Sequence, residues 1–503
     1  MTISKTLFQY FLCCPKNAWL KLHKPELREH FSLSDFDKHL MEQGNDVESY
    51  AHNLFPNGIE VASTGQDACN ETERLMAAKV SAIFQATFIA DDFLARNDVL
   101  CFNPENNCWD LYEVKGSNSL KEHVRERDHI TDVAFQVSVL KRSGIALGRF
   151  YVIHVNKDYV RTGELDFKSL FITEDVTEKV SEKLPEVENQ MVVAKEYLTN
   201  DKEPAGPCDC LYRGKAGHCS TFRYSNPKIP EYSVHYISNI HKTKLEKLIE
   251  AGIVDLNDIS EDFALTEKQR NQVTAHQRQQ SVIDKVEIKK QLDALRFPLY
   301  FFDYEATGPA IPAFNGYGPY KRIPFQFSLH ILRTPEGELE HIEYLHPDLT
   351  DPTKKVAQLL KQHILPGGTV IAWHKSYEEG VDREISIRLP DYAEFFENMN
   401  KSFWDLKEIF SKQHYIHHGF HGSASLKKVQ PVIAPNLPYK ELDIQEGGEA
   451  VDAWWKMVSP RTSPEEKQQI EKQLKIYCGQ DTYIMYVIWK HLYNLVNETV
   501  LQS

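Results

Sequence analysis

The chain has 503 residues, of which 42% are hydrophobic and 26% are charged, and its net charge at pH 7 is −14. This length predicts two or three domains that each bury a core, and the composition excludes a disordered chain. The negative charge excludes a surface that is basic all over and coats nucleic acid. It leaves nucleases open, because metal-binding carboxylates make an active site acidic and a binding groove needs only local positive charge.

The N-terminal segment has a short apolar run that superficially resembles a signal peptide. The run is interrupted by Gln9, and no small-residue cleavage site follows it, so the segment does not predict a secretion signal. No apolar run in the sequence approaches the ~20 residues that cross a bilayer. We therefore predict a cytoplasmic protein that has no membrane partner.

Residues 82–155 show the pattern of a mixed sheet that is joined by one helix. Alternating and β-branched side chains predict the strands, and an apolar period of helical type predicts the helix. The predicted strands cover residues 82–90, 93–102, 109–115 and 149–155, and the predicted helix covers residues 130–142. The first half of the chain is therefore expected to contain an α/β core.

Two carboxylates and a lysine stand on neighbouring strands of this core. Asp98 lies on one strand, and Glu113 and Lys115 lie at the exit of the next, where their spacing places both on one face. This is the PD-(D/E)xK arrangement. In chemical terms, Asp98 and Glu113 would ligate Mg²⁺, with the Val114 carbonyl as an extra ligand. Lys115 would position the water and stabilise the charged phosphate.

The flanking residues extend this resemblance to the RecB-like nucleases. Gln136 lies on the following helix, where those nucleases have a Q-x-x-x-Y motif, although Leu140 replaces the tyrosine here. Residues 44–58 resemble the first helix of that family. The resemblance implies a catalytic role for Gln136, and it implies His52, or alternatively Glu48, as a further metal ligand.

Three thiols lie close together after this core. Cys208, Cys210 and Cys219 share a short loop, and Cys14, which precedes Pro15, supplies a fourth, with Cys13 as the alternative. Four thiolates suit either zinc or a 4Fe–4S cluster. One cysteine before the core and three after it resemble the layout of the CRISPR-associated iron–sulfur exonucleases. This resemblance favours the iron–sulfur cluster, with zinc as the alternative.

The remaining cysteines and the middle of the chain carry weaker signals. Four further cysteines are expected to be structural: Cys69, Cys101, Cys108 and Cys478. Residues 232–259 predict a small helical module, and residues 265–295 are polar and helical in period. Residues 226–297 are therefore expected to form a helical connector.

The C-terminal half begins with a run of strand character that ends in two acids. Asp303 and Glu305 are expected on one face of this strand, where burying both is costly unless a cation compensates them. A divalent metal such as Mg²⁺ or Mn²⁺ suits such oxygen ligands, and solvated acids at a strand end are the alternative. The motif alone leaves both interpretations open.

Two later segments add an acid each. A second strand covers residues 367–373, and Glu378 opens the helix that follows it. A long helix is predicted for residues 465–495. Tyr477 and Asp481 are four residues apart on it, so they share one helix face.

This order resembles the DnaQ-like 3′–5′ exonucleases of the DEDD type, Tyr subclass, which have an RNase H-like fold. The resemblance covers residues 298–497 and implies that four carboxylates hold two metals while Tyr477 orients the attacking water. The four implied ligands are Asp303, Glu305, Glu378 and Asp481. The family normally has Asp where Glu378 stands, and Glu379 and Asp382 are close enough in sequence to substitute. The whole chain resembles an uncharacterised bacterial family that fuses this domain to a RecB-like nuclease.

Basic residues beside these motifs are candidates for contact with nucleic acid. Lys321 and Arg322 follow an aromatic loop that suits stacking on a single-stranded end, and Lys427 and Lys428 open a predicted helix. Packing of the loop within its own domain and ordinary capping of the helix are the alternatives. Asp405 is expected to be structural.

The predicted fold class is a multidomain α/β protein with a PD-(D/E)xK core and an RNase H-like domain. The predicted domains are residues 1–225, 226–297 and 298–503. The predicted function is a metal-dependent nuclease with two active sites, acting on DNA with a free or single-stranded end. One alternative is a nucleic-acid-binding or assembly module with lost catalysis, and another is a phosphatase or nucleotide hydrolase.

Overall fold

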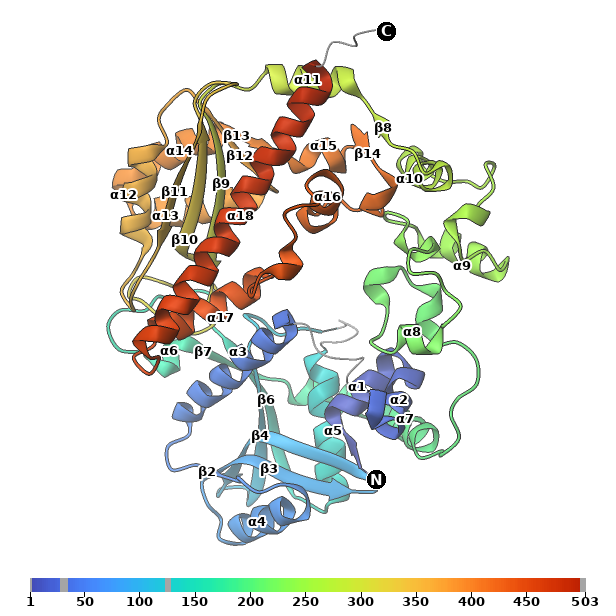
Figure 1. Cartoon of the computed structure of the whole chain (residues 1–503). Coiled ribbons are helices and arrows are strands. Elements are labelled where there is room, and N and C mark those ends of the chain that lie inside the picture. The colour runs from blue at the N-terminus through green and yellow to red at the C-terminus, as the bar shows by residue number, and fades with distance from the viewer. Residues whose placement is uncertain (1, 28–34, 123–127, 498–503) are drawn as a thin grey trace. The chain divides into compact units, whose positions relative to one another are not determined.

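The structure is a computed structural model that describes residues 2–27, 35–122 and 128–497 (Figure 1). It divides into two compact units: unit 1 comprises residues 1–228 and 309–320, and unit 2 comprises residues 229–308 and 321–503. Each unit combines helices with a mixed sheet, so the predicted multidomain α/β class is confirmed. Within the described residues, every helix is too short or too polar to cross a membrane.

Unit 1 is built on a mixed sheet in the order β2-β3-β4-β5-β6-β7, with β1 paired to β4. Its strands are β1 (Ile3–Ser4), β2 (Ile59–Glu60), β3 (Ala82–Ala90), β4 (Phe93–Asn103), β5 (Cys108–Lys115), β6 (Leu147–Val155) and β7 (Phe171–Asp175). Strand β4 is antiparallel to β3 and β5, and β6 is antiparallel to β7, whereas β5 and β6 are parallel. The strands expected at residues 82–90, 93–102, 109–115 and 149–155 are therefore present as β3, β4, β5 and β6.

The helices of unit 1 pack around this sheet. They are α1 (Lys5–Cys13), α2 (Pro15–His23), α3 (Asp35–Ala51), α4 (Gly65–Ala77), α5 (His129–Arg142), α6 (Phe167–Leu170), α7 (Thr177–Leu198) and α8 (Phe222–Ser225). The Phe135 ring of α5 lies 5.0 Å from the Phe8 ring of α1 and 5.9 Å from the Phe93 ring of β4, measured between centroids. This aromatic contact fixes α1 against the carboxylate-bearing part of the sheet.

Residues 309–320 fold onto unit 1 although they follow a strand of unit 2 in sequence. Gly316 N donates to the Arg161 carbonyl at 2.7 Å, and Arg161 N donates to the Tyr317 carbonyl at 3.0 Å. The Arg161 guanidinium also donates to the carbonyls of Pro312 and Ala313. The buried Tyr317 thus belongs to a packed segment.

Unit 2 contains a five-stranded mixed sheet in the order β11-β10-β9-β12-β13. The strands are β9 (Leu299–Thr307), β10 (Ile323–Leu332), β11 (Leu339–Leu345), β12 (Thr369–Ala372) and β13 (Phe403–Asp405). Strands β9, β12 and β13 are parallel, and β10 is antiparallel to β9 and β11. Side chains that follow the ends of β9 and β12 therefore gather at one edge of the sheet.

Several helices of unit 2 cover the two faces of this sheet. The helices of this unit are α9 (Lys242–Glu250), α10 (Glu267–Arg278), α11 (Lys285–Asp293), α12 (Thr353–His363), α13 (Ser376–Arg388), α14 (Ala393–Lys401), α15 (Lys407–Ser411), α16 (Leu426–Ile433), α17 (Gly447–Val458) and α18 (Pro464–Asn497). Helices α9 and α10 belong instead to a separate hydrophobic cluster. Phe301 packs with the layer that holds α17 and α18, whereas Phe302 and Tyr304 pack with the layer that holds α12 and α13. Alternation along β9 therefore aims Asp303 and Glu305 toward α17 and α18.

The segment before β9 is less uniform than its helical period suggests. Residues 265–295 form α10 and α11, separated by the short strand β8 (Val282–Ile283), which pairs with β14 (Tyr415–Ile416). Gln279 adopts a left-handed conformation at the end of α10. A left-handed residue followed by β-branched side chains ends the helix here.

Candidate metal and active sites

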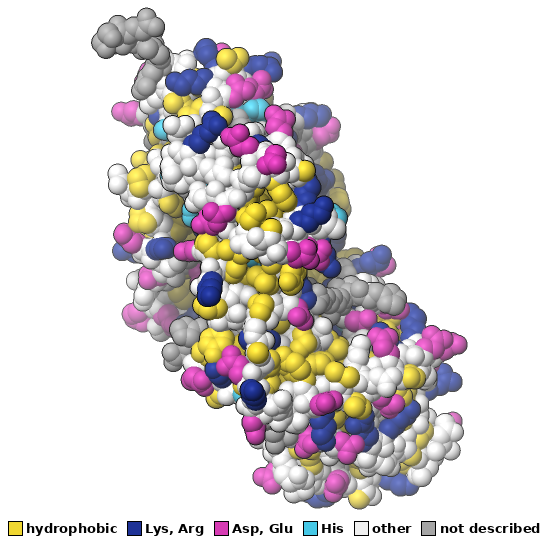
Figure 2. Space-filling model, turned by 90° about the vertical axis from the view of Figure 1, so that its right-hand side faces the viewer, with side chains coloured by type: hydrophobic (Ala, Val, Ile, Leu, Met, Phe, Trp, Pro, Cys, Tyr) yellow, Lys and Arg dark blue, Asp and Glu magenta, His cyan; other side chains and the backbone are white. Residues whose placement is uncertain are grey.

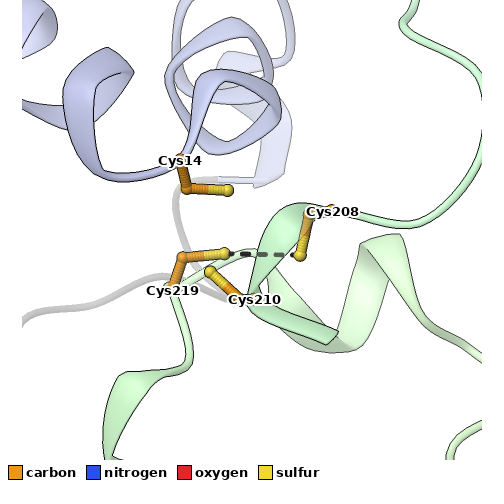
Figure 3. A group of neighbouring side chains, drawn as sticks. All are labelled: Cys14, Cys208, Cys210 and Cys219. Carbon is orange, nitrogen blue, oxygen red and sulfur yellow. Dashed lines mark hydrogen bonds between the residues drawn. The ribbon is translucent and has the colours of Figure 1, made fainter. Parts of the chain in front are cut away.

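Four thiols of unit 1 converge, as the cysteine spacing predicts (Figure 3). Cys14 lies at the junction of α1 and α2, and Cys208, Cys210 and Cys219 lie in the loop after α7. Their sulfur atoms all lie within 4.8 Å of one another, and the Sγ atoms of Cys208 and Cys219 are 3.9 Å apart. None of the four forms a disulfide. This thiol group can bind a metal such as zinc or an iron–sulfur cluster.

The surroundings of the thiol group suit bound thiolates. The side chains of Asn226 and Arg213 approach the sulfurs of Cys208 and Cys210 at 3.4 and 3.7 Å. Hydrogen bonds from Cys14 and the other thiols lower the pKa of Cys208. Zn–S bonds of about 2.3 Å in a tetrahedron place sulfurs about 3.8 Å apart. The observed spacing matches a single ion, and a four-iron cluster requires the sulfurs to separate.

The Glu113 carboxylate is the centre of a second polar cluster in unit 1. Its side chain is 1% exposed, and its Oε1 accepts from Lys5 at 2.5 Å and from Lys115 at 2.8 Å. Its Oε2 accepts from Gln136 Nε2 at 2.6 Å. Lys115 also binds Asp132 at 2.6 Å. The predicted residues Glu113, Lys115 and Gln136 are thus in direct contact.

This cluster is balanced in charge. Burial alone would raise the pKa of Glu113, but the charges of Lys115 and Lys5 outweigh it and hold that pKa below its ordinary value. Burial alone would lower the pKa of Lys115, but Glu113 and Asp132 hold it above its ordinary value. The side chains of Glu113 and Lys115 are therefore both ionised at neutral pH.

Sequence reasoning missed three members of the cluster. Lys5 and Gln9 are one turn apart on α1, and they bind Glu113 and Asp132, respectively. Asp132 lies one turn before Gln136 on α5. The signal was the polar pair in an otherwise apolar helix, but its partners are more than a hundred residues away in the chain.

The other two predicted metal ligands, Asp98 and His52, do not take part in the ion pairs of Glu113 with Lys5 and Lys115. Asp98 Oδ2 accepts from the Val114 backbone N–H at 2.7 Å, and burial followed by the Glu113 charge raises the pKa of Asp98. His52 stacks on Phe84 with 3.8 Å between the ring centroids, and its Nε2 lies 3.7 Å from Glu48. Among the described residues, His52, Asp98 and Glu113 do not form a group whose ligand atoms all lie within 4.8 Å of one another.

Unit 2 holds a different arrangement, in which acids gather without such compensation. Asp303 and Glu305 extend from β9, Glu378 lies in the first turn of α13, and Asp481 lies on α18. Burial, followed by the charge of Asp481, raises the pKa of both Asp303 and Glu305 well above the ordinary range. Glu378 raises both values further. The four predicted carboxylates thus act on one another across three elements.

The other two acids of this set are equally shifted. Burial raises the pKa of Asp481 to about 7 and that of Glu378 to about 8. Glu378 is 2% exposed, and its Oε2 has no hydrogen-bond partner among the described residues. Buried acids that are close together and unpaired are the electrostatic pattern of a cation site.

The two substitutes proposed for Glu378 lie elsewhere. Asp382 accepts a hydrogen bond from the Tyr304 hydroxyl at 2.9 Å, and Tyr304 points to the opposite face of the sheet from Asp303. Glu379 pairs with Lys375 on the helix surface at 3.3 Å. Glu378 is therefore the acid of α13 that acts on Asp303.

Tyrosines surround the acids. Tyr477 is buried, and burial followed by the Asp481 charge raises its pKa. Tyr439 donates a hydrogen bond to Asp481 Oδ1 from the 3-10 helix Tyr439–Glu441, and it carried no motif that could have identified it. Cys478, which was expected to be structural, lies with its sulfur 4.0 Å from Asp303 Oδ2.

Two of the four predicted basic residues lie near these acids. The Arg322 guanidinium is 4.9 Å from the Tyr377 ring centroid, and its charge lowers the pKa of Glu378. The charge of Lys427 lowers the pKa of Asp481. Lys321 and Lys428 are exposed. Figure 2 shows Lys and Arg side chains interspersed with Asp and Glu over the face in view.

Comparison with known proteins gives limited matches. Residues 300–425 match a family described as a domain of unknown function, DUF2779, and this range includes Asp303, Glu305 and Glu378 but not Asp481. The uncharacterized protein MG366 of Mycoplasma genitalium is 23% identical over 233 residues, which are 42% of this chain and 34% of that protein. The chain thus spans about a third of the length of this curated relative. No solved structure matches the chain.

Proposed function

We propose that the protein is a metal-dependent nuclease that hydrolyses phosphodiester bonds, with an exonuclease site in unit 2. The observation that carries the proposal is the set of four carboxylates from β9, α13 and α18, of which Glu305 and Glu378 are buried and Asp303 and Asp481 partly buried, together with Tyr477. The mixed sheet that positions them supports the RNase H-like expectation. The orphaned Glu378 Oε2 supports a cation as the missing partner.

The residues of unit 2 divide the work of such a site. Two divalent cations such as Mg²⁺ or Mn²⁺, when bound, supply activation of the attacking water and stabilisation of the leaving oxygen. Asp303, Glu305, Glu378 and Asp481 would hold them. The Tyr477 hydroxyl orients the water, and Tyr439 fixes Asp481 by its hydrogen bond. Arg322 and Lys427 attract the phosphate backbone toward the acids.

We extend the proposal to unit 1 as a second, PD-(D/E)xK-type site. Lys115 holds a proton at Nζ and would stabilise the scissile phosphate, while Asp98 and Glu113 would hold the cation. Glu113 fits a cation less well than the acids of unit 2, because Lys5, Lys115 and Gln136 occupy both of its oxygens. This closed pairing favours a second candidate role for unit 1, a nucleic-acid-binding module without catalysis.

The thiol group completes the proposal. We propose that it holds a 4Fe–4S cluster, which the layout of the cysteines favours, or zinc as the alternative, which the observed sulfur spacing favours, and that the metal ties α1 to the loop after α7. The substrate we propose is DNA with a free or single-stranded end in the cytoplasm. The aromatic loop that was expected to stack on this end belongs in part to unit 1, so Arg322 is the nearer candidate contact.

A nuclease panel tests both sites. Labelled single- and double-stranded DNA and RNA are incubated with Mg²⁺ or Mn²⁺, with and without EDTA. Asp303→Asn should lower one EDTA-sensitive activity by more than roughly a hundredfold, the upper end for loss of a contact that supports a metal. Lys115→Ala should remove a second activity if unit 1 is catalytic. Asp382→Asn is the matched control, because it changes a buried acid on α13 that faces Tyr304.

The panel separates the alternatives. Binding without EDTA-sensitive cleavage on any polymer contradicts the nuclease proposal and supports a binding or assembly module. Hydrolysis of mononucleotides without cleavage of polymers indicates a phosphatase or nucleotide hydrolase. Full activity in the Asp303→Asn, Lys115→Ala double variant refutes both site assignments.

A further inference from the structure

A thiol lies among the acids of unit 2. Cys478 follows Tyr477 on α18, and it is fully buried. Among the described residues, the ligand atoms of Asp303, Glu305 and Cys478 all lie within 4.8 Å of one another, and no other group that includes these acids does so. The acids therefore have a sulfur donor beside them that the proposed exonuclease chemistry does not use.

The spacing of these donors matches a metal of small radius. Zn–S bonds of about 2.3 Å and Zn–O bonds of about 2.1 Å, at a tetrahedral angle, place sulfur and oxygen about 3.6 Å apart. The Cys478 sulfur lies 4.0 Å from Asp303 Oδ2. A shift of a few tenths of an ångström brings the pair to that distance.

A second observation points to a cation at this place. Glu378 is only 2% exposed, and its Oε2 has no hydrogen-bond partner among the described residues. Its charge raises the pKa of both Asp303 and Glu305. The N-terminus of α17 lies on the same side, because a Cβ at Gly447 would be 3.7 Å from Glu305 Oε2. The N-terminus of α17 supplies only a partial positive charge, so the three donors lack a full positive charge from these neighbours.

We propose that Asp303, Glu305 and Cys478 bind one thiophilic divalent cation of the zinc class. Mg²⁺ prefers oxygen ligands, whereas thiolate selects zinc and related ions. The proposal rests on the proposed function only in sharing Asp303 and Glu305. It names the metal class for one position of that site, and it identifies Cys478 as a ligand.

Cobalt is the probe, because Co²⁺ takes zinc sites and its bond to a thiolate gives a near-ultraviolet charge-transfer band. The full-length protein is first treated with citrate, which removes weakly bound metal. Co²⁺ is then the only metal that is added in the titration. The thiol group of unit 1 contributes equally to wild type and Cys478→Ser, so their difference isolates Cys478. Cys69→Ser is the matched control, because Cys69 is a buried free cysteine on α4 of unit 1.

The wild type and Cys69→Ser should share a charge-transfer component that Cys478→Ser lacks. The apparent Kd for Co²⁺ should rise at least roughly tenfold in Cys478→Ser, since weaker contacts around metal sites already cost that much. Asp303→Asn, which keeps the thiol, should weaken Co²⁺ binding as well. Thermal unfolding of each variant, and Cys478→Ala as a second replacement, show whether a loss arises from misfolding.

The outcomes separate this proposal from the nuclease proposal. Identical cobalt spectra for wild type and folded Cys478→Ser overturn the metal class, even where Asp303→Asn abolishes cleavage. A cobalt–thiolate band that depends on Cys478, in a protein without nuclease activity, overturns the nuclease and leaves the metal site standing.

Discussion

The carboxylate clusters of the two units solve the same electrostatic problem in opposite ways. In unit 1, Glu113 is buried between two lysines, and its pKa lies below the ordinary value. In unit 2, Glu305 is buried and Asp303 partly buried among other acids, and their pKa values lie well above it. The difference teaches that lysines of the chain compensate the first cluster, whereas the acids of the second take up protons or, as we propose, a cation. Each prediction below tests that contrast.

The largest effect is expected from the thiol group, which belongs to unit 1 alone. Cys14→Ser should abolish metal binding there and make the protein poorly soluble, because structural metal sites contribute roughly 10 kcal/mol to folding in small domains. Iron, sulfide and zinc analysis of protein purified without oxygen, together with soluble yield, checks this. Cys69→Ser should behave as wild type. Equal metal content in Cys14→Ser would refute the assignment.

The second prediction tests the compensation in unit 1. Glu113→Gln leaves the partly buried Lys5 and Lys115 beside a neutral amide, so unfolding of unit 1 should become easier by about 3–5 kcal/mol, the usual cost of breaking a buried pair. Chemical denaturation monitored by hydrogen exchange in β5 measures it. Glu186→Gln, which removes an exposed pair with Lys183, should cost less than about 1 kcal/mol. A similar loss of unfolding free energy in Glu113→Gln and Glu186→Gln would contradict a compensating role of the lysines around Glu113.

The third prediction concerns pH, for which the two units should differ in sign. Asp481 and Glu378 have pKa values of about 7 and about 8 when folded, against about 4 when unfolded. Folded unit 2 therefore binds more protons than the unfolded chain, so it should lose stability as pH rises from about 4 to about 8. In unit 1, the Glu113 contribution has the opposite sign, because it is lost as pH falls from the ordinary pKa of Glu113 toward its lower folded pKa. The raised pKa of Asp98 works against it, so the sign is read in Asp98→Asn protein.

Hydrogen exchange measures both trends. Protection in β9 is compared at about pH 5 and about pH 8 in EDTA, and protection in β5 of Asp98→Asn protein at about pH 5 and about pH 3, after correction for the intrinsic rates. Mn²⁺ should restore the protection of β9 at the higher pH, since it binds the ionised acids. The contrast fails if β5 and β9 respond to pH in the same direction.

The smallest effect is expected from Tyr477→Phe. The change removes one hydroxyl and leaves all four acids in place, so cleavage by unit 2 should fall only roughly tenfold, the lower end for contacts that support a metal site. Steady-state rates with a labelled single strand measure it. Trp109→Phe, a buried aromatic change in unit 1, is the control. A loss as large as that of Asp303→Asn would show that Tyr477 holds the acids together.

Local patterns predicted the strands and brought the acids of unit 2 into one candidate site. The strand expected at residues 82–90 is β3, and Asp303, Glu305, Glu378 and Asp481 act on one another because two parallel strands end at one edge. The convergence of the four thiols was predictable, because cysteine spacing is a strong sequence signal. Asp405 accepts hydrogen bonds from the backbone N–H groups of His374 and Lys407, which suits its expected structural role.

Contacts that join distant parts of the chain were not predictable. Lys5 meets Glu113 only because α1 packs across the sheet, and Tyr439 meets Asp481 from a 3-10 helix without a motif. Residues 265–295 were expected to be helical in period, and that period does not reveal the short strand β8 between α10 and α11, which pairs with β14. In each case the deciding partner lies far away in sequence, where periodicity carries no information.

Helix α1 has one more consequence. It carries Lys5 and Gln9 into the carboxylate cluster of unit 1, and it ends where Cys14 enters the thiol group. A helix of nine residues is a stiff rod of about 13 Å, so its two ends move together. The Lys5 ammonium and the Cys14 thiol are thus positioned by the two ends of one helix. The carboxylate cluster and the thiol group of unit 1 therefore share α1 as a common support.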